Sequence, residues 1–443
     1  MRFLIAPNFA LPYDQRMTRG LASALVAAGH EARAILGPLH EAEAAGVCRS
    51  LGIDVLLQVN RFRPLDPPLP QGVRHVAWFQ DVFPETVNGM SERIHADDIV
   101  YTLGDPRVLG VNTELPCKVG TLLTGIEASE WNTAGVSLAG ETDFSLCGFI
   151  PPHLVIAPHF RADLAWYLID LVNRVPLAGP PFAAMARYAT VRKYVPTALR
   201  RALISVVESL YQPLRGELDI HALTNAMVDA IEPYVGHREI HKALSRSRRR
   251  RKKRTRFDLL FGDYEFRSLE AGGPIMAFIS YLARDYPRAM DRAALVQNVL
   301  ALSKSVELYG RGWESYEEFK PYHCGVLATP MELARVYVRS RINLANNTHG
   351  LGLHARTLEC MATGGFILIH ESPNDAKPGG MLTSFESDVH YGAFKPETLQ
   401  ETALRWLKDS ERRKRAGASA AKVVREKHLW CHRAEQLVTD LKG

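Results

Sequence analysis

Short apolar runs, separated by helical or polar segments, recur along the first third of the chain. The opening run, Arg2–Ala6, leads through a polar loop to a helical pattern at about 15–28, then to Gly29 and a second run at 31–36. Further runs follow at 53–59, 73–79, 99–103 and 119–123. Strands that alternate with helices predict a mainly parallel sheet that is covered on both faces.

The most informative pattern lies in residues 340–374. An apolar run leads into a polar loop that contains Gly350 and Gly352, then into a short helical pattern, a Gly-Gly pair and a second apolar run. This order predicts strand, loop, helix, turn and strand. Loop glycines let the backbone approach a ligand and a helix N-terminus presents free N–H groups, so we expect an anionic ligand here.

Two charged residues follow this loop in the predicted helix. Arg356, Glu359 and Thr363 are spaced to share one face, and we expect Leu358 and Met361 to lie on the buried face. One interpretation of Arg356 and Glu359 is a surface ion pair at i,i+3 spacing. Their position favours a ligand site instead, because open α/β sheets bind ligands at the carboxyl ends of their strands.

The run RTLECMATGGFILI, with GLGLHA before it and LYGRGW upstream, resembles the C-terminal half of GT-B glycosyltransferases. It is most similar to the group related to the spore-maturation protein CgeB. The resemblance extends from Val306 to about Glu371, and elsewhere only the layout is similar. It implies an enzyme with two Rossmann-like α/β domains that transfers a sugar from a UDP- or GDP-linked donor to an acceptor, which is a saccharide, a protein or a lipid-linked molecule.

At 443 residues the chain exceeds the size at which single cores stop growing, so two domains are expected. A polar, turn-rich stretch after Thr124 places the boundary near residue 135. We predict an acceptor-side domain at 1–135 and a nucleotide-sugar-binding domain at 136–427. A long helical insertion is predicted at about 153–302, and a helix at 428–443 is expected to cross back to the first domain, as in GT-B relatives.

The resemblance assigns the donor site residue by residue. Glu359 matches the family glutamate that accepts hydrogen bonds from the ribose hydroxyls. Three cations are available for the diphosphate, so the resemblance implies no metal and no cofactor; the alternative is that Arg311 is a surface charge and Lys377 a loop residue. The predicted donor-binding set is Gly148, Gly310, Arg311, Gly350, Gly352, Leu353, Arg356, Glu359 and Lys377.

The chain departs from the family pattern beside the donor sugar. Retaining GT-B enzymes often carry a second glutamate eight residues before the ribose glutamate, and Leu351 stands at that position. We therefore expect inversion of configuration, with His349 contacting the donor and a general base from the first domain. Asp81 follows the strand RHVAWFQ and is the candidate base; its other interpretation is a helix N-cap.

Two other functions fit parts of the sequence. The stretch GLGLHA matches a G-x-G-x-x-A dinucleotide fingerprint, with Glu371 as the ribose-binding acid, which indicates an NAD-dependent oxidoreductase. The other alternative is a non-catalytic scaffold with GT-B layout. The fingerprint helix is short and lies late in the chain, so the glycosyltransferase prediction is preferred.

Charge is concentrated in a basic arm, Lys242–Arg256, which holds ten basic residues and no acidic one. The formal net charge of the chain is +6, so the remainder carries six minus ten, or −4. This imbalance does not favour nucleic acid as a partner. The arm is interpreted as a solvated loop, as an attachment to anionic membrane lipid, or as a docking arm for an acidic polymer or RNA. Sedimentation with anionic vesicles measures the attachment to lipid.

Six scattered cysteines without a C-x-x-C pair predict neither a zinc site nor a disulfide framework. No signal peptide or membrane-spanning run is apparent. We expect a cytoplasmic protein that is peripheral to the membrane if the arm binds lipid.

Overall fold

The computed structural model of the chain describes residues 1–80, 93–109, 111, 113–131, 141–151, 286–346 and 350–442. Asp81, His349, the basic arm and residues 152–285 of the predicted insertion lie outside this part. The chain divides into two compact units. The larger unit, 1–148, 297–310 and 322–443, contains both sheets described below, and the smaller unit comprises 149–296 and 311–321.

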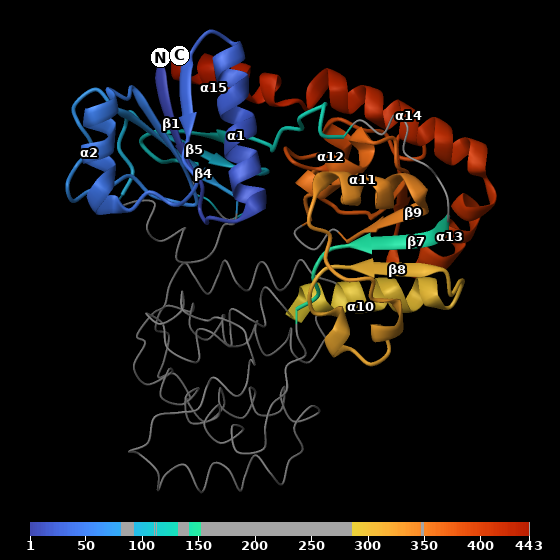
Figure 1. Cartoon of the computed structure of the whole chain (residues 1–443). Helices are drawn as coiled ribbons and strands as arrows, with labels where there is room; N and C mark the ends of the chain where they lie inside the picture. Colours follow the sequence, from blue (N-terminus) through green and yellow to red (C-terminus); the bar gives the residue numbers. More distant parts are fainter. Residues whose placement is uncertain are drawn as a thin grey trace, which may run out of the picture. The chain divides into compact units, whose positions relative to one another are not determined.

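The first sheet, within the described residues, has six parallel strands in the order β2-β1-β3-β4-β5-β6 (Figure 1). Helices α1 (Pro12–Ala27) and α2 (Glu41–Leu51) follow its first two strands. The strands are β1 (Arg2–Ala6), β2 (Glu31–Ala34), β3 (Val55–Val59), β4 (Arg74–Phe79), β5 (Ile99–Thr102) and β6 (Lys118–Thr121).

Alternation along β1 explains why both faces of this sheet are covered. Phe3 and Ile5 belong to an apolar cluster with residues of α1, whereas Leu4 and Ala6 belong to a second cluster with residues of α2. Successive side chains of a strand point to opposite faces, so an uninterrupted apolar strand needs a helix on each side.

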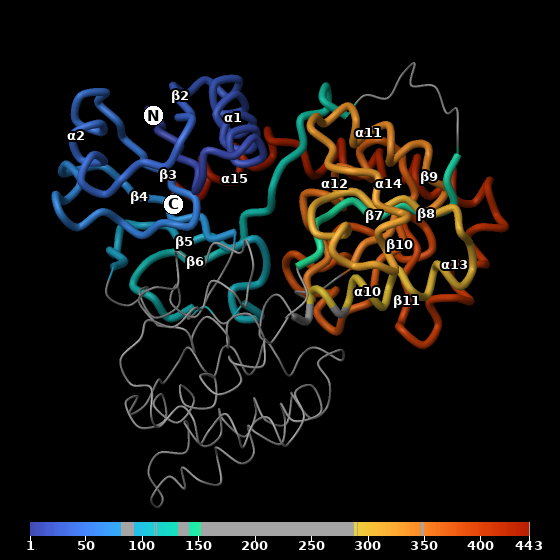
Figure 2. The backbone as a smooth tube through the Cα atoms, turned by 60° about the horizontal axis from the view of Figure 1, so that its bottom comes forward, coloured from blue at the N-terminus to red at the C-terminus, as the bar shows by residue number. Residues whose placement is uncertain are grey.

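The second sheet, among the described residues, has five parallel strands in the order β11-β10-β9-β7-β8 (Figure 2). An apolar cluster joins helices α11 (Pro330–Arg339), α12 (Ala355–Ala362) and α14 (Ser410–Lys427) to strand β10 (Ile367–His370). These two sheets confirm the predicted fold class, two parallel α/β domains. The strands are β7 (Thr142–Cys147), β8 (Val306–Tyr309), β9 (Ser340–Ala345), β10 (Ile367–His370) and β11 (Gly392–Phe394).

Six helices accompany this half of the chain, counted over the residues that the structure describes. None of the described helices combines the length and the apolar character that a membrane span requires. They are α10 (Tyr286–Leu300), α11 (Pro330–Arg339), α12 (Ala355–Ala362), α13 (Leu399–Lys408), α14 (Ser410–Lys427) and α15 (Trp430–Lys442).

The last helix, α15, packs against the first sheet beside α1 (Figure 1). Trp430 lies edge-on to Trp78 of β4, with ring centroids 6.4 Å apart. Gly20 of α1 and Gly125 leave room for its indole, because a Cβ added at either glycine would lie within 2.6 Å of ring atoms. Asp440 accepts hydrogen bonds from Tyr101 Oη at 2.5 Å and pairs with Lys118 Nζ at 2.7 Å.

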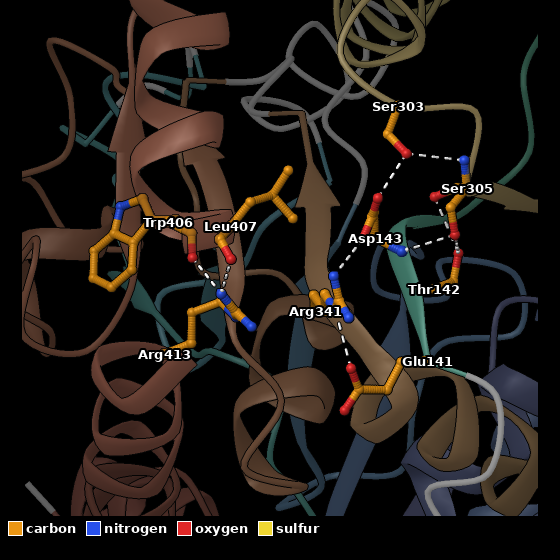
Figure 3. A network of polar contacts seen from close by, with 9 residues as sticks. All are labelled: Glu141, Thr142, Asp143, Ser303, Ser305, Arg341, Trp406, Leu407 and Arg413. Atoms are coloured by element: carbon orange, nitrogen blue, oxygen red, sulfur yellow. Dashed lines mark hydrogen bonds and ion pairs between the residues drawn. The ribbon is translucent and has the colours of Figure 1, made fainter. Parts of the chain in front are cut away.

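A polar network joins the amino ends of the strands of the second sheet (Figure 3). Arg341 of β9 donates to Glu141 and Asp143, both at 3.0 Å. Ser303 donates to Asp143 at 2.6 Å, and Thr142 donates to the Ser305 carbonyl at 3.1 Å. The network ties the starts of β7, β8 and β9 together at the edge opposite their carboxyl ends.

The smaller unit has its own aromatic core. The Trp313 and Tyr316 rings lie 5.6 and 5.7 Å from the ring of Phe319. Tyr316 Oη donates to the Pro151 carbonyl at 2.6 Å, and Ile150 N donates to the Arg311 carbonyl at 2.9 Å. These bonds join residues 149–151 to 311–321.

One element predicted from the sequence is wrong. The short apolar run at 325–328 predicts a strand, but none of these residues belongs to a strand, and Val326 is 60% exposed. Gly325 adopts φ +96°, and its carbonyl accepts a hydrogen bond at 2.9 Å from the N–H of Gly310, the residue after β8. Pro330 is favoured at the first position of a helix, and this prediction is confirmed by α11, with a capping box between Thr329 and Glu332.

We expect Gly20→Ala to weaken the docking of α15. Its Cβ would lie 2.2 Å from Trp430 Nε1, and the indole is enclosed by Gly125 and Trp78, so it has little room to shift. Overpacking of this kind costs about 1–3 kcal/mol of unfolding free energy. Urea unfolding measures the loss.

Gly46→Ala is the matched control, since Gly46 also lies in a helix of this domain, α2, and an added Cβ would contact nothing within 4 Å. It should stabilise by about 0.5–1 kcal/mol through helix propensity. A Gly20→Ala protein as stable as wild type would contradict the docking account.

Candidate functional site

The order of the second sheet places a switch point between β7 and β9. From β7 the chain continues to β8 on one side, and the later strands β9, β10 and β11 are added on the other side. The loops that leave β7 and β9 at their carboxyl ends therefore diverge. Open α/β sheets bind ligands in the crevice that such a divergence creates.

Arg356 bridges this switch point. It lies in the first turn of α12, which follows β9, and its Nη1 donates to the carbonyl of Cys147, the last residue of β7, at 3.2 Å. The side chain is exposed. Within the described residues this is the hydrogen bond that the guanidinium makes, so a cation is held at the strand ends with four of its five donors available to an anion.

The glycine loop before α12 is held in a fixed shape. Gly350 adopts φ +73°, and an added Cβ would lie 3.0 Å from Asn374 Nδ2. Its carbonyl accepts from Ser372 Oγ at 2.6 Å, and Leu353 N donates to the Gly379 carbonyl at 2.9 Å. The residue before α12 makes no side-chain capping hydrogen bond to the first turn of the helix, where backbone N–H groups lack intrahelical acceptors.

Glu359 is buried, although its helical spacing set it on a different face from the buried residues Leu358 and Met361. Its residue exposure is 3%, and Thr363 is also buried at 9%. The partner of its carboxylate is Arg16 of α1, whose Nη2 lies 2.5 Å from Glu359 Oε1. The alternative interpretation, a surface pair at i,i+3 spacing, is not seen among the described contacts, and Glu359 instead pairs with a residue 343 positions away.

Arg16 has a set of partners that the sequence did not indicate. Its guanidinium lies over the rings of Trp131, 5.5 Å from the centroid, and Tyr13, at 5.8 Å. Its Nε lies 3.7 Å from Glu130 Oε2. Two aromatic faces and two carboxylates thus fix its orientation. None of these residues lies in a motif, so no local signal could have identified them.

The electrostatics of Glu359 follow from its burial. Desolvation raises the pKa of this carboxyl, and the positive charges of Arg16 and then Arg356 oppose the rise. Burial raises the pKa of the neighbouring Cys147 thiol to about 12, with Arg356 lowering it and Glu359 raising it. The site therefore contains one buried carboxyl that depends on two arginines for its charge.

The other predicted donor residues are placed as follows. Gly148 and Gly310 directly follow β7 and β8, and Gly148 N donates to the Tyr309 carbonyl at 2.7 Å. Gly352 and Leu353 are buried in the loop before α12. Lys377 is exposed in a turn, where its N donates to the Asn374 carbonyl at 2.9 Å. Arg311 belongs to the smaller unit.

Two further positions bear on the predictions. Leu351, at the place of the missing glutamate, is buried at 5% exposure. Glu371, the acid of the dinucleotide alternative, follows β10 and lies 3.8 Å from Lys395 Nζ. The predicted catalytic residues Asp81 and His349 lie outside the described residues.

A family model described as "Glycosyl transferase-like" matches residues 288–439, a region that includes strands β8 to β11 and helix α12. This match confirms the prediction of a glycosyltransferase, and it covers Glu359 and Arg356. A search of curated proteins finds no match to the chain.

Three solved structures align with almost the whole chain at low sequence identity. Anabaena HepE in complex with UDP-glucose has 12% identity and a TM-score of 0.45, with 100% of this chain and 99% of that chain covered. AviGT4, a glycosyltransferase involved in avilamycin A biosynthesis, has 10% identity and a TM-score of 0.46, with 100% of this chain and 97% of that chain covered. Sucrose-phosphate synthase from Thermosynechococcus elongatus has 10% identity and a TM-score of 0.44, with 99% of this chain and 98% of that chain covered.

We expect Glu359→Gln to change the pH dependence of stability. Because burial raises the pKa of Glu359 above 4.5, the folded chain binds this proton more tightly than the unfolded chain. The unfolding free energy of wild type minus that of the variant should fall as pH rises from the ordinary pKa to the raised one. The fall is about 1.4 kcal/mol for each unit of the shift. Urea unfolding between about pH 4 and pH 7 measures it.

Glu332→Gln is a control of opposite sign. Backbone N–H groups of Ala328 and Thr329 donate to Glu332 and lower its pKa, so its contribution is present above the ordinary pKa and is lost as pH falls. The unfolding free energy of wild type minus that of this variant should therefore rise with pH. Parallel slopes for the two variants would contradict the electrostatic assignment of Glu359.

Proposed function

We propose that this chain transfers a sugar from a UDP- or GDP-linked donor, bound at the switch point of the second sheet, to an acceptor that faces the first sheet domain. The observation that carries the proposal is that one short helix at the ends of β7 and β9 presents both a buried carboxylate, Glu359, and an exposed cation, Arg356. The glycosyl transferase-like match covers both residues.

Each part of a nucleoside diphosphate has a complementary group in this proposal. Glu359 accepts hydrogen bonds from the ribose hydroxyls, since an ionised carboxylate is an acceptor only. Arg356 and the uncapped N–H groups of α12 receive the diphosphate, because a guanidinium and a helix N-terminus both favour phosphate oxygens. Lys377, Gly310 and Arg311 complete the predicted donor set.

Leaving-group stabilisation is the chemistry that these groups perform. The glycosidic bond to the diphosphate breaks with negative charge developing on the phosphate oxygens, and preorganised cations lower the energy of that state. We infer an inverting reaction, in which a general base deprotonates the acceptor hydroxyl. Asp81 stays the predicted base and His349 the predicted donor contact.

The group to which the chain belongs, its location in the cell and the role of the basic arm are part of the same proposal. We place the chain in the CgeB-like group on the strength of its motifs and expect it in the cytoplasm, with the basic arm as an attachment to anionic membrane lipid. The dinucleotide alternative is an outcome of the first experiment below, because NAD would require the same glycine loop.

Glu359→Ala and Arg356→Met should weaken binding of UDP or GDP measured by titration calorimetry. Loss of one hydrogen bond to a charged group costs about 1.5–3 kcal/mol, which is roughly 10- to 150-fold in affinity. Arg335→Met, at an exposed arginine of the neighbouring helix α11, is the matched control and should bind as wild type does.

Unchanged affinity in both site variants would overturn the donor assignment. Binding of NAD in preference to UDP and GDP would replace it with the oxidoreductase. Thermal unfolding of each variant shows whether it is folded.

Turnover should not require a divalent metal, because the proposed diphosphate site is built from cations of the chain. Calorimetry identifies the preferred nucleotide, UDP or GDP. Activity with a sugar donor that carries this nucleotide is expected to be equal with and without EDTA. Loss of activity in EDTA that Mg²⁺ or Mn²⁺ restores would contradict this prediction.

A further inference from the structure

The described residues place an arginine from the first sheet domain against the acid that the proposed function assigns to the ribose. Arg16 Nη2 lies 2.5 Å from Glu359 Oε1, and the two side chains are 26% and 5% exposed. Glu359 is at the donor site of the second sheet, whereas Arg16 lies on α1, which packs on the first sheet. The ion pair thus links the two sheets directly.

We propose that Arg16 is a positioning residue for the donor site, which aims the Glu359 carboxylate and keeps it ionised for the ribose hydroxyls. The inference rests on the proposed function. It assigns to the first sheet domain a part in donor binding, in addition to its predicted part in acceptor binding.

The surroundings of Arg16 suit this role. Trp131, 3% exposed, and Tyr13 flank the guanidinium, and Glu130 lies 3.7 Å from Nε. An arginine held on two rings and two carboxylates keeps one orientation, so the Oε1 that it contacts is fixed as well. The hydrogen bond from Arg16 reaches Oε1, and no donor of the described residues contacts Glu359 Oε2, which is the atom we assign to the ribose.

A carboxylate this deeply buried needs a positive charge nearby. Burial favours its neutral form, and a protonated carboxyl is a weaker acceptor for a hydroxyl. Of the charges that act on Glu359, Arg16 has the largest effect, and Arg356 has the next largest. The titratable and charged groups that face it from the surrounding elements are Arg16 and Tyr13 of α1, Glu130, Cys147 of β7, Tyr337 of α11, and Arg356 and Cys360 of α12.

The test is UDP and GDP affinity as a function of pH for Arg16→Met, which keeps an apolar stem but removes the charge. Without Arg16 the pKa of Glu359 rises further, so affinity should fall at a higher pH than in wild type. The ratio of the two affinities cancels protonation of the nucleotide itself. We expect about a tenfold loss at neutral pH, the lower end of the range for a charged hydrogen bond, and a larger loss in acid.

Three variants separate positioning from a structural role. Arg16→Lys retains the charge and should restore most of the affinity and the wild-type pH profile. Arg19→Met removes an exposed arginine one turn further along α1, whose hydrogen bonds go to Gln15, and should change neither. Adding Arg16→Met to Glu359→Gln should produce no further pH dependence, because the titrating group is already absent.

The outcomes distinguish this inference from the proposed function. If wild type binds neither UDP nor GDP, the proposed function fails and the role of Arg16 falls with it. Suppose that wild type binds one of them and that the ratio of the wild-type affinity to the Arg16→Met affinity is the same at every pH. Arg16 then does not act through Glu359, and this inference alone is overturned. An equal loss in the Glu359→Gln background would likewise overturn it, since Arg16 would then contact the nucleotide directly.

Discussion

Parallel pairing is the constraint on which the rest of this structure depends. Each strand must return through a connection to the same end of the sheet, so all carboxyl ends lie at one edge. In the second sheet the strand order then makes the loops after β7 and β9 diverge, and the glycine loop, Arg356 and Glu359 all follow from β9 at that point. The position of the candidate site follows from the topology, and its residues are those that follow the strand ends, in the loop after β9 and in α12.

The two edges of the second sheet have different polar chemistry. At the amino edge Arg341 is matched by Glu141 and Asp143, and Ser303 and Ser305 complete the hydrogen bonding (Figure 3). Such a network holds strands in register and leaves little capacity for a ligand. At the carboxyl edge an uncapped helix and an exposed arginine retain donors, which is what recognition of an anion requires.

The Glu359 carboxylate shows how one buried charge links distant parts of the chain. A lone carboxylate in this position would be neutralised by its surroundings, so its function depends on a cation supplied from elsewhere. Arg16 supplies it from α1, whose own position is fixed by Trp430 of α15 next to Gly20. The last helix of the chain, the first helix and the proposed donor site are therefore connected through packed side chains.

Local patterns in the sequence were sufficient to predict the two sheets, the strand–loop–helix–strand unit around Gly350 and the helix that begins at Pro330. These features depend on apolar periodicity, turn glycines and caps, which act over a few residues. The same spacing rules set Glu359 and Thr363 apart from the buried face of their helix, but both residues are buried. Helical spacing gives relative direction on one helix but not what packs against it.

The sequence by itself determined which helix carries the acid and the cation and at which strand end they lie. Only the tertiary structure decided that Glu359 is buried, that Arg16 is its partner, and that Arg356 reaches the end of β7. Those contacts span 343 and 209 positions of sequence. They are set by strand order and by the docking of whole helices, and no local propensity carries information about either.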